Sequence, residues 1–271
     1  AGLAYLLARR GVAVTLLERR TDSSREFRGE VLMPSGLDAL AQMGLAEELA
    51  QIEGHLMQSA SILLNNTPIV DVELAGLSPP LSIRAVSQPA LLESLITKAL
   101  AYPNFVFRRG AAVKDLMRNA GGRITGVRYS CDGELHELRA TLVVGADGRN
   151  SAVRKLSGIS NAQAGAAADG QPMDIVWCKL PCPKGWDGVK AYAGRGHLLV
   201  AYRTWGNSLQ IGWVILKGTF GELRQRGMPE WVDKMADAMV GEERDDERKI
   251  PVHPYVARRM SYFGFWQTRE V

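Results

Sequence analysis

The sequence predicts an α/β protein in two parts: a parallel-sheet unit whose segments are separated along the chain, and a mostly antiparallel sheet. Three observations predict it. A helix-forming stretch at residues 2–10 is followed by Gly11 and by an apolar run at 12–18, which is the second half of a βαβ unit. Strand-like segments follow one another at hairpin spacing in 173–216. The small and polar stretch 160–172 separates the two regions.

The helices and strands of the first half are predicted from the spacing of apolar residues and from the residues that end each element. Helix formers over 2–10 end in two arginines before Gly11, and the strand at 12–18 is apolar enough to be buried on both faces. A helix is predicted over 34–52, interrupted at Gly44, and another over 88–101. Strand patterns fill 59–87 and 105–148, and within them 140–148 (ATLVVGADG) has the composition of the most buried strand.

The second half is dominated by strands. Four are predicted, over 173–180, 189–194, 197–205 and 208–216, followed by a helix over 229–240 and a charged stretch at 242–249. We expect the strands of 59–87 to join this sheet, which makes the parallel-sheet domain discontinuous. The predicted division is 1–58 and 88–158 for the first domain, 59–87 and 159–262 for the second, and 263–271 as a return towards the first.

Composition narrows the function classes. The 271 residues include 33 basic and 29 acidic ones, a net charge of +4 that is mixed along the chain, so no nucleic-acid partner is predicted. No apolar run approaches the ~20 residues of a membrane span, and no signal-peptide layout is present. We therefore predict a cytoplasmic protein without a transmembrane segment.

The three cysteines form no disulfide framework. Cys178 and Cys182 have a Cys-x3-Cys spacing that a zinc site can use, but no second Cys or His pair lies nearby. Reduced thiols in a cytoplasmic protein are the simpler interpretation, and no metal site is predicted.

Gly2 and Glu18 carry the first chemical signal. In a dinucleotide-binding βαβ unit, the last glycine of GxGxxG lets the helix pack on the strand, and an acidic residue about 20 residues after the first glycine binds a ribose hydroxyl. Glu18 lies 16 residues after Gly2, which suits those two roles. A glycine at a helix start and a glutamate at a strand end are also common without any ligand.

The second signal is Asp147 with Gly148, which end the predicted strand 140–148. Ligands of open α/β sheets bind at the carboxyl ends of strands, and Arg154 lies about one turn into the segment that follows. An ordinary Asp-Gly turn is the alternative.

Residues 147–154, DGRNSAVR, match the pattern DGxxSxxR and resemble the middle fingerprint of the FAD-dependent aromatic hydroxylases. These are single-component flavoprotein monooxygenases of the para-hydroxybenzoate hydroxylase type. The opening residues 1–20, with Glu18 and Arg19, resemble the end of the first FAD fingerprint of that family. Residues 25–45 and 83–95 resemble the two segments between these fingerprints, so four segments match in the family's order.

The resemblance implies a Rossmann-like FAD-binding domain with an inserted antiparallel substrate domain. It implies FAD contacts for the following residues: Gly2, Glu18, Arg19, Arg28, Gln88, Asp147, Gly148 and Arg154. Arg28 as a surface-loop residue, Gln88 as a helix-start residue and Arg154 as an ion-pair partner are the structural alternatives. No catalytic side chain is implied, because the cofactor supplies the chemistry.

The activity implied is oxidation of NAD(P)H and transfer of one oxygen atom of O₂, through a C4a-hydroperoxyflavin, to a small aromatic substrate. A reductase, epoxidase or halogenase of the same fold, or a chain inactive by itself, is the alternative. The family's first strand, first two glycines and third fingerprint have no match in these 271 residues. We therefore expect an interior piece of a longer chain that binds FAD weakly or not at all alone. No oligomeric state is predicted.

Aromatic and histidine residues give weaker signals. Trp177, Trp205 and Trp213 lie on predicted strands, where packing in the sheet is the simple interpretation and lining an aromatic pocket is the alternative. His197 and His253 are single histidines for which we expect structural roles.

Overall fold

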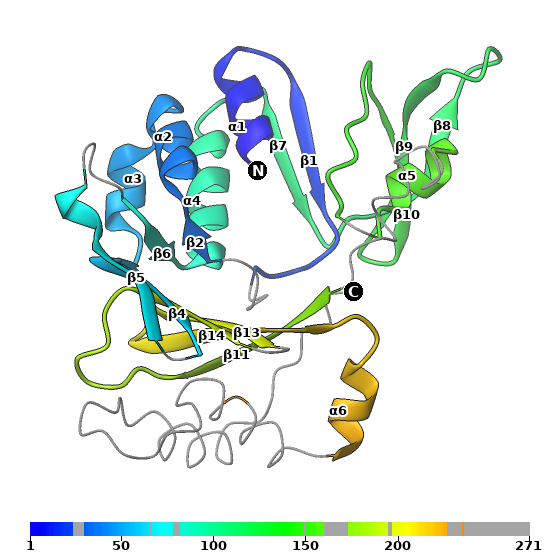
Figure 1. The fold of residues 1–271 in the computed structure, drawn as a ribbon. Helices are drawn as coiled ribbons and strands as arrows, with labels where there is room; N and C mark the ends of the chain where they lie inside the picture. The colour runs from blue at the N-terminus through cyan, green and yellow to red at the C-terminus, as the bar shows by residue number, and fades with distance from the viewer. Residues whose placement is uncertain are drawn as a thin grey trace. The chain divides into compact units, whose positions relative to one another are not determined.

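The chain divides into two compact units in the computed structural model (Figure 1), which describes residues 1–23, 30–65, 67–77, 82–148, 150–159, 173–194, 197–226 and 235. One unit consists of Ala1–Arg25 and Leu92–Gly170, and the other of Glu26–Leu91 and Gln171–Val271. Each unit is therefore assembled from two separate stretches of sequence.

The first unit contains a parallel strand pair covered by a helix. Helix α1 (Gly2–Arg9) ends at Gly11, whose φ of +79° turns the chain back into β1 (Val14–Glu18). Strand β1 pairs in parallel with β7 (Phe105–Arg109), with Val14 opposite Phe105 and Glu18 opposite Arg109. Because α1 runs back along β1, its first residue lies towards the carboxyl end of the strand (Figure 1).

The rest of this unit is an antiparallel meander and a short helix. Strands β8 (Ala112–Arg118), β9 (Ile124–Cys131) and β10 (Glu134–Arg139) lie in the order β10-β9-β8. Helix α5 (Ala152–Ser157) packs on β8, and Arg118 of that strand donates a hydrogen bond to the carbonyl of Leu156 at 3.1 Å.

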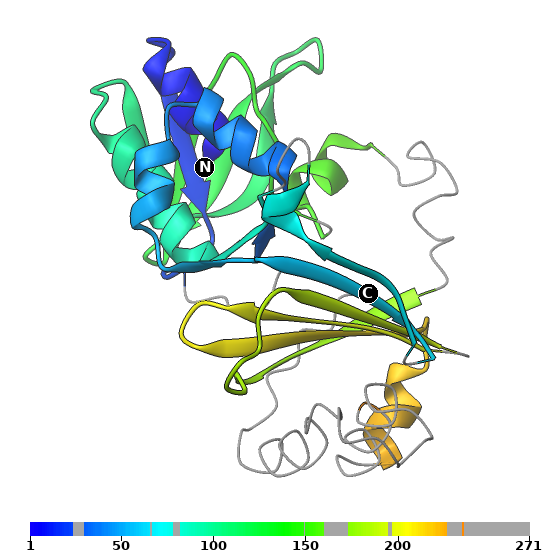
Figure 2. The same ribbon diagram turned by 60° about the vertical axis from the view of Figure 1, so that its left-hand side comes forward.

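The second unit is built on a six-stranded sheet, visible in Figure 2, with the order β11-β14-β13-β12-β4-β5. Its strands are β4 (Ser59–Leu64), β5 (Thr67–Glu73), β11 (Met173–Pro181), β12 (Val189–Gly194), β13 (His197–Thr204) and β14 (Ser208–Leu216). Strands β11 to β14 are antiparallel, and β4 joins them by a parallel pairing with β12. Positive φ angles at Gly206 and Asn207 form the tight turn between β13 and β14.

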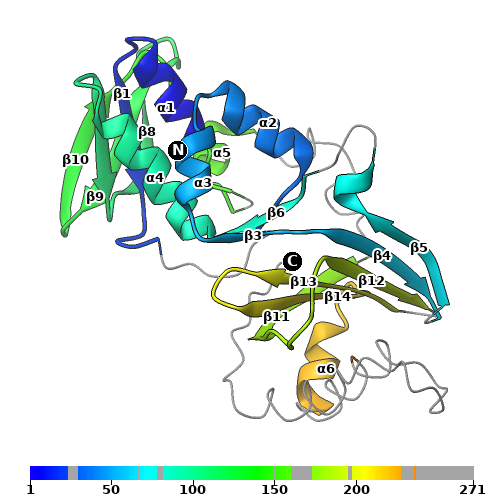
Figure 3. The same cartoon turned by 90° about the vertical axis from the view of Figure 1, so that its left-hand side faces the viewer.

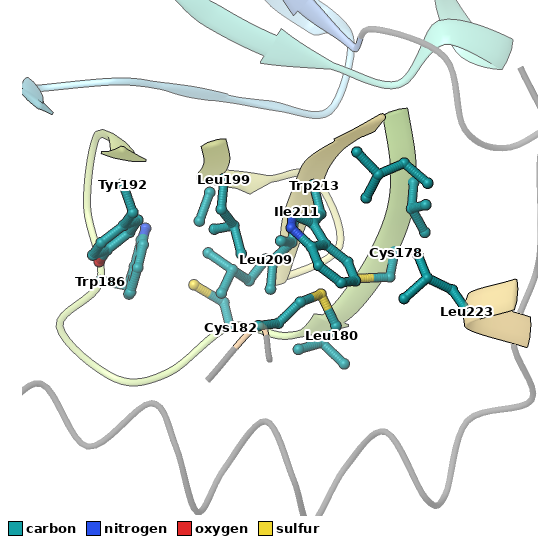
Figure 4. Close-up of a cluster of buried hydrophobic side chains, with 14 residues drawn as sticks. Cys178, Leu180, Cys182, Trp186, Tyr192, Leu199, Leu209, Ile211, Trp213 and Leu223 are labelled. Atoms are coloured by element: carbon teal, nitrogen blue, oxygen red, sulfur yellow. The ribbon is translucent and has the colours of Figure 1, made fainter. Parts of the chain in front are cut away.

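One face of this sheet carries the larger hydrophobic core (Figure 4). Alternate residues of β11, β13 and β14 point to this face, because side chains alternate along a strand. The members are Val176, Cys178, Leu180, Leu199, Ala201, Leu209, Ile211, Trp213 and Ile215, with Cys182, Trp186 and Tyr192 beside them. Helix α6 (Phe220–Arg226) contributes Leu223 to the same core.

The opposite face meets a small three-stranded sheet. Strands β2 (Val31–Leu32), β6 (Arg84–Val86) and β3 (Gly54–Leu56) have the order β2-β6-β3 and lie on the other side of the large sheet from α6 (Figure 3). Between the sheets lies a second core of Met57, Leu74, Ile83, Ala85 and Tyr202. Leu74 begins the short helix η1 (Leu74–Gly76).

Three further helices follow the predicted pattern. The expected helix 34–52 is two helices, α2 (Pro34–Gln42) and α3 (Ala46–Gln51), because Gly44 has a φ of +74° between them. Helix α4 (Gln88–Leu100) begins after Ser87, whose hydroxyl accepts a hydrogen bond from the amide of Ala90 at 3.4 Å. No helix among the described residues is both long and apolar enough to cross a bilayer.

The prediction of a buried strand over 140–148 is wrong. Residues 141–147 belong to none of the sheets in the described part of the chain, and Leu142 and Val144 are exposed. A run of apolar residues is buried as a parallel strand only when it joins a sheet whose two faces are covered, and among the described residues the segment 141–147 pairs with no strand. The helix predicted over 229–240 lies outside the described residues except for Met235, which is a buried core residue.

Candidate cofactor site

Glu18 lies at the carboxyl end of β1, where ligands of parallel sheets bind. Its side chain and that of Arg19 are exposed, and one carboxylate oxygen of Glu18 accepts the amide of Arg20 at 2.8 Å. Gly2 is the first residue of α1, towards the same end of the strand. The unit therefore presents an accessible acceptor carboxylate near a helix N-terminus, where backbone N–H groups favour anions.

Asp147 caps helix α5 with both carboxylate oxygens. Oδ1 accepts a short hydrogen bond from the Ser151 hydroxyl, while Oδ2 accepts the amides of Ala152 and Val153 at 2.7 and 3.2 Å. Burial acts to raise the pKa of Asp147, but the hydrogen bonds from Ser151, Val153 and Ala152 outweigh it and lower that pKa. The Asp-Gly turn thus has a local structural role alongside the cofactor role predicted for it.

The glycines around Asp147 permit this turn. Gly148 has a φ of +81°, in the region that favours glycine, and a Cβ there would meet no atom within 4 Å. A Cβ at Gly145 would lie 2.9 Å from the Cβ of Val153, so Gly145 lets the loop approach α5 closely. The backbone of this turn is accessible to a ligand at Gly148.

Arg154 follows on α5, where its amide donates to the Ser151 hydroxyl at 3.0 Å. Ser151 is the N-cap of α5, since its φ and ψ are non-helical and its oxygen accepts this bond. Ser151 thus joins the Asp147 carboxylate to the helix, together with the amides of Ala152 and Val153.

A second charged cluster lies within the first unit. Arg109, the last residue of β7, donates through Nη2 to both oxygens of Glu93 at 2.6 and 2.5 Å, and through Nη1 to the Ser23 hydroxyl at 3.2 Å. Its guanidinium lies 4.9 Å from the ring centroid of Phe107. The hydrogen bond from Ser23, followed by that from Arg109, lowers the pKa of Glu93.

Gln88 is the first residue of α4, half-buried, and directly follows the capping residue Ser87. Arg28 lies outside the described residues. Of the predicted cofactor residues, the structure brings Gly2, Glu18 and Arg19 to one end of a strand pair, and it places Asp147, Gly148 and Arg154 on one turn and helix.

The sequence analysis did not identify Glu30, which is the most buried carboxylate among the described residues. It accepts Lys179 Nζ at 3.0 Å, Thr204 Oγ1 at 3.0 Å and Trp205 Nε1 at 2.9 Å. These donors lie about 150 residues or more further along the chain, so no local pattern could have indicated them. The one sequence signal is a charged residue directly before the apolar strand residues Val31 and Leu32.

The structure separates the three candidate tryptophans. Trp213 is 6% exposed and packs in the larger core. It therefore cannot line a pocket on the opposite face of the sheet. Trp177 lies against Gly212, and Trp205 contacts Glu30 and Lys179. Cys178 is also in the larger core, where burial raises the pKa of its thiol to about 12. The side chain of His197, and all of His253, lie outside the described part.

Comparison with known proteins identifies the class. A family model described as "FAD binding domain" matches residues 1–255, and the chain belongs to this family. The predicted α/β fold with a FAD-binding domain and the resemblance to the flavoprotein hydroxylases are thereby confirmed.

Two of the curated relatives are named as a monooxygenase and an epoxidase. The chain is 29% identical over 238 residues to 6-methylpretetramide 4-monooxygenase of Streptomyces rimosus, a match that covers 88% of the chain and 56% of the relative. It is 25% identical over 201 residues to squalene epoxidase 1 of Arabidopsis thaliana, covering 73% and 35% of the two chains. The chain thus spans about half the length, or less, of these curated relatives.

Among solved structures, PqsL of Pseudomonas aeruginosa, a probable FAD-dependent monooxygenase, superposes with a TM-score of 0.68 at 20% identity. The match covers 89% of this chain and 64% of PqsL. A second PqsL structure, in complex with 2-aminobenzoylacetate, superposes with a TM-score of 0.65. At this identity the likeness shows the fold.

The residues present fit a flavin nucleotide. Glu18 offers an exposed carboxylate to a ribose hydroxyl, and the turn at Gly148 lacks a side chain that would block approach to its backbone. Asp147 accepts three hydrogen bonds from Ser151, Ala152 and Val153, which hold this turn at the start of α5.

Proposed function

We propose that the chain is part of a flavoprotein monooxygenase, one that oxidises NAD(P)H and uses O₂ to hydroxylate a small aromatic substrate. Glu18, exposed at the carboxyl end of β1 in a chain that belongs to the FAD-binding family, is the observation that carries the proposal. The bound FAD would supply the redox chemistry, while the protein binds it, orients the substrate and excludes water.

The roles proposed within the first unit follow from its geometry. Glu18 accepts hydrogen bonds from the FAD ribose, and Arg19 lies beside it with an exposed cationic side chain. Gly2 allows α1 to begin close to the cofactor, and Gly148 and Arg154 contact it from the second fingerprint. Arg28 and Gln88 are also proposed as FAD contacts.

The aromatic substrate class has two supports. It follows from the resemblance of four ordered segments to the aromatic hydroxylases, and the ligand of PqsL, 2-aminobenzoylacetate, is itself aromatic. The exclusion of Trp213 leaves Trp177 and Trp205 as the candidate aromatic contacts from the large sheet. The reduced, buried thiols Cys178 and Cys182 accord with the cytoplasmic location that we propose.

The proposal is tested by expressing the chain within a polypeptide of its relatives' length and recording the visible absorbance spectrum. We expect flavin absorbance, NADH or NADPH oxidation that rises with an aromatic substrate, and O₂ uptake in step with it. Glu18→Ala should weaken FAD binding about tenfold, the equivalent of one lost charge-assisted hydrogen bond. Glu134→Ala, at an exposed position on β10, is the control. A colourless protein that cannot be reconstituted with FAD would contradict the proposal.

A second candidate function is epoxidation of an alkene. The similarity to squalene epoxidase 1 favours it, because that relative matches 73% of the chain. Product analysis separates the two functions: a hydroxylated ring supports the first and an epoxide the second. NAD(P)H oxidation without O₂ uptake would favour a reductase over both.

A further inference from the structure

Glu30 carries a fully enclosed negative charge between the two sheets of the second unit. Its side chain is 1% exposed and that of Lys179 is 14% exposed. The Lys179 ammonium lies 3.0 Å from both carboxylate oxygens, and Thr204 and Trp205 donate to Oε2. One carboxylate thus takes donors from β11, from the end of β13 and from the turn that follows it.

The backbone of Glu30 belongs to the other sheet. Its carbonyl accepts the amide of Val86 at 2.8 Å, which extends the β2–β6 pairing of Val31 with Ala85 by one residue. Glu30 therefore joins the small sheet through its backbone and the large sheet through its side chain.

Glu30 is also linked to two of the predicted cofactor residues. One is near it in sequence, and the other is near a residue that donates a hydrogen bond to it. Arg28 precedes it by two residues, and its partner Val86 precedes Gln88 by two residues. Ser87, between Val86 and Gln88, caps α4. The start of α4 is thus two residues away from a hydrogen bond to Glu30.

The cluster fixes geometry more than it adds stability. A buried ion pair loses hydration, so an apolar pair of similar size is often as stable or more stable. The same carboxylate also orients an aromatic ring: Trp205 donates its indole N–H to Glu30, while the Lys179 ammonium lies 4.2 Å from the ring centroid. Replacing Glu30 would release the ring and the ammonium, and with them the side-chain link between the small sheet and the large one.

We propose that Glu30 is a positioning residue that holds β2 and the start of α4 against the Lys179–Trp205 end of the large sheet. This inference rests on the proposed function for its consequence, which is that cofactor affinity depends on a carboxylate that does not touch the cofactor. Glu30 sets the placement of the start of α4, which carries Gln88, and Trp205 is held in the same arrangement.

The test compares three variants. Glu30→Gln keeps the shape but removes the charge opposite Lys179, so it is expected to lower the melting temperature. Glu30→Met combined with Lys179→Met removes both charges and is expected to recover that temperature. Glu53→Gln is the control, because the exposed Glu53 contacts the same turn through the amide of Gly206 at 2.9 Å.

Hydrogen exchange measured by mass spectrometry gives the readout that is independent of FAD. In the double variant we expect peptides covering residues 84–91 to exchange about tenfold faster than in the control, although the melting temperature is recovered. In the FAD-binding polypeptide we expect the Kd for FAD to rise about tenfold in the same variant.

Two results would overturn the inference: unchanged exchange over 84–91, or an unchanged Kd for FAD, in a stable double variant. An unsubstituted polypeptide that takes up no FAD would instead contradict the proposed function, and exchange would then decide the positioning role of Glu30 by itself.

Discussion

The ring of Trp177 lies against Gly212 on the neighbouring strand, so closely that a Cβ on Gly212 would be 2.6 Å from the ring atom Cζ3. The two residues are direct partners in the β11–β14 register. Glycine at 212 therefore makes the room that the indole occupies on the face of the sheet that also carries Lys179 and Gln210.

Gly212→Ala should displace the Trp177 ring. Overpacking of this kind costs about 1–3 kcal/mol, because the added methyl group meets a ring anchored in the sheet. The measurement is the free energy of unfolding in urea, with tryptophan fluorescence to detect ring movement. Gly36→Ala is the matched control: Gly36 is helical, its nearest contact would be 3.7 Å away, and a helical alanine should stabilise by a few tenths to about 1 kcal/mol. Equal stability of Gly212→Ala and the unsubstituted chain would contradict the packing described.

Asp147→Asn should destabilise α5 and change the pH dependence of stability. The folded-state pKa of Asp147 lies below its ordinary 3.8, so its carboxylate stabilises the fold above about pH 4, and that contribution is lost as pH falls through the lowered pKa. We expect a loss of about 1 kcal/mol at pH 7, typical of a helix cap, and a smaller difference at pH 3. Thermal melting at both pH values measures it. A constant difference between the variant and the unsubstituted chain would argue against the cap.

Gln210→Leu should raise stability. Gln210 is fully buried, and neither atom of its side-chain amide has a hydrogen-bond partner, although Lys179 and Tyr202 flank it in the register. Leucine removes that desolvation cost, which is of the order of 1–3 kcal/mol for a buried unpaired polar group. Gln42→Leu on the exposed surface of α2, where Gln42 bonds Asp38, is the control and should not stabilise. A destabilised Gln210→Leu would mean that the amide has a partner in solution.

Cys131 and Cys178 should react in the order of their accessibility. Cys131 is half-exposed, whereas Cys178 is enclosed in the larger core, where burial raises its pKa to about 12. Alkylation at pH 8 should therefore modify Cys131 in the folded chain and Cys178 only on unfolding, since the thiolate is the reactive species. Peptide mass spectrometry reads out the sites. Equal rates at the two cysteines would show that the core opens far more readily than its packing implies.

Local patterns predicted the regular elements well because those elements depend on nearby residues. Gly11 ends α1, Gly44 separates α2 from α3, and Gly206 with Asn207 turns β13 into β14, each through a positive φ. The prediction of a buried strand at 140–148 was wrong because burial depends on elements elsewhere in the chain, which the sequence of this segment does not reveal. Leu142 and Val144 are apolar and yet exposed.

The residues of the candidate site that stand in local motifs were predictable, and those brought together by distant strands were not. Glu18 and Asp147 stand in short motifs, so their positions at a strand end and a helix start could be anticipated from spacing. Glu30 could not be found in this way, because Lys179, Thr204 and Trp205 come to it only through the pairing of distant strands. The sequence also gave no indication that both oxygens of Asp147 would be used within the protein.

The hydrogen bonds around Asp147 show that part of the DGxxSxxR pattern serves the local fold, which limits what a match to the pattern indicates about a ligand. Of the fixed positions in DGxxSxxR, Asp147 and Ser151 build the cap of α5, and Gly148 supplies the left-handed turn between them. A protein that used this loop for another purpose would need the same three residues. The aspartate, glycine and serine of this pattern therefore indicate a flavin only together with the other segments, and a search for unrecognised flavoproteins would gain by requiring several of the segments in order.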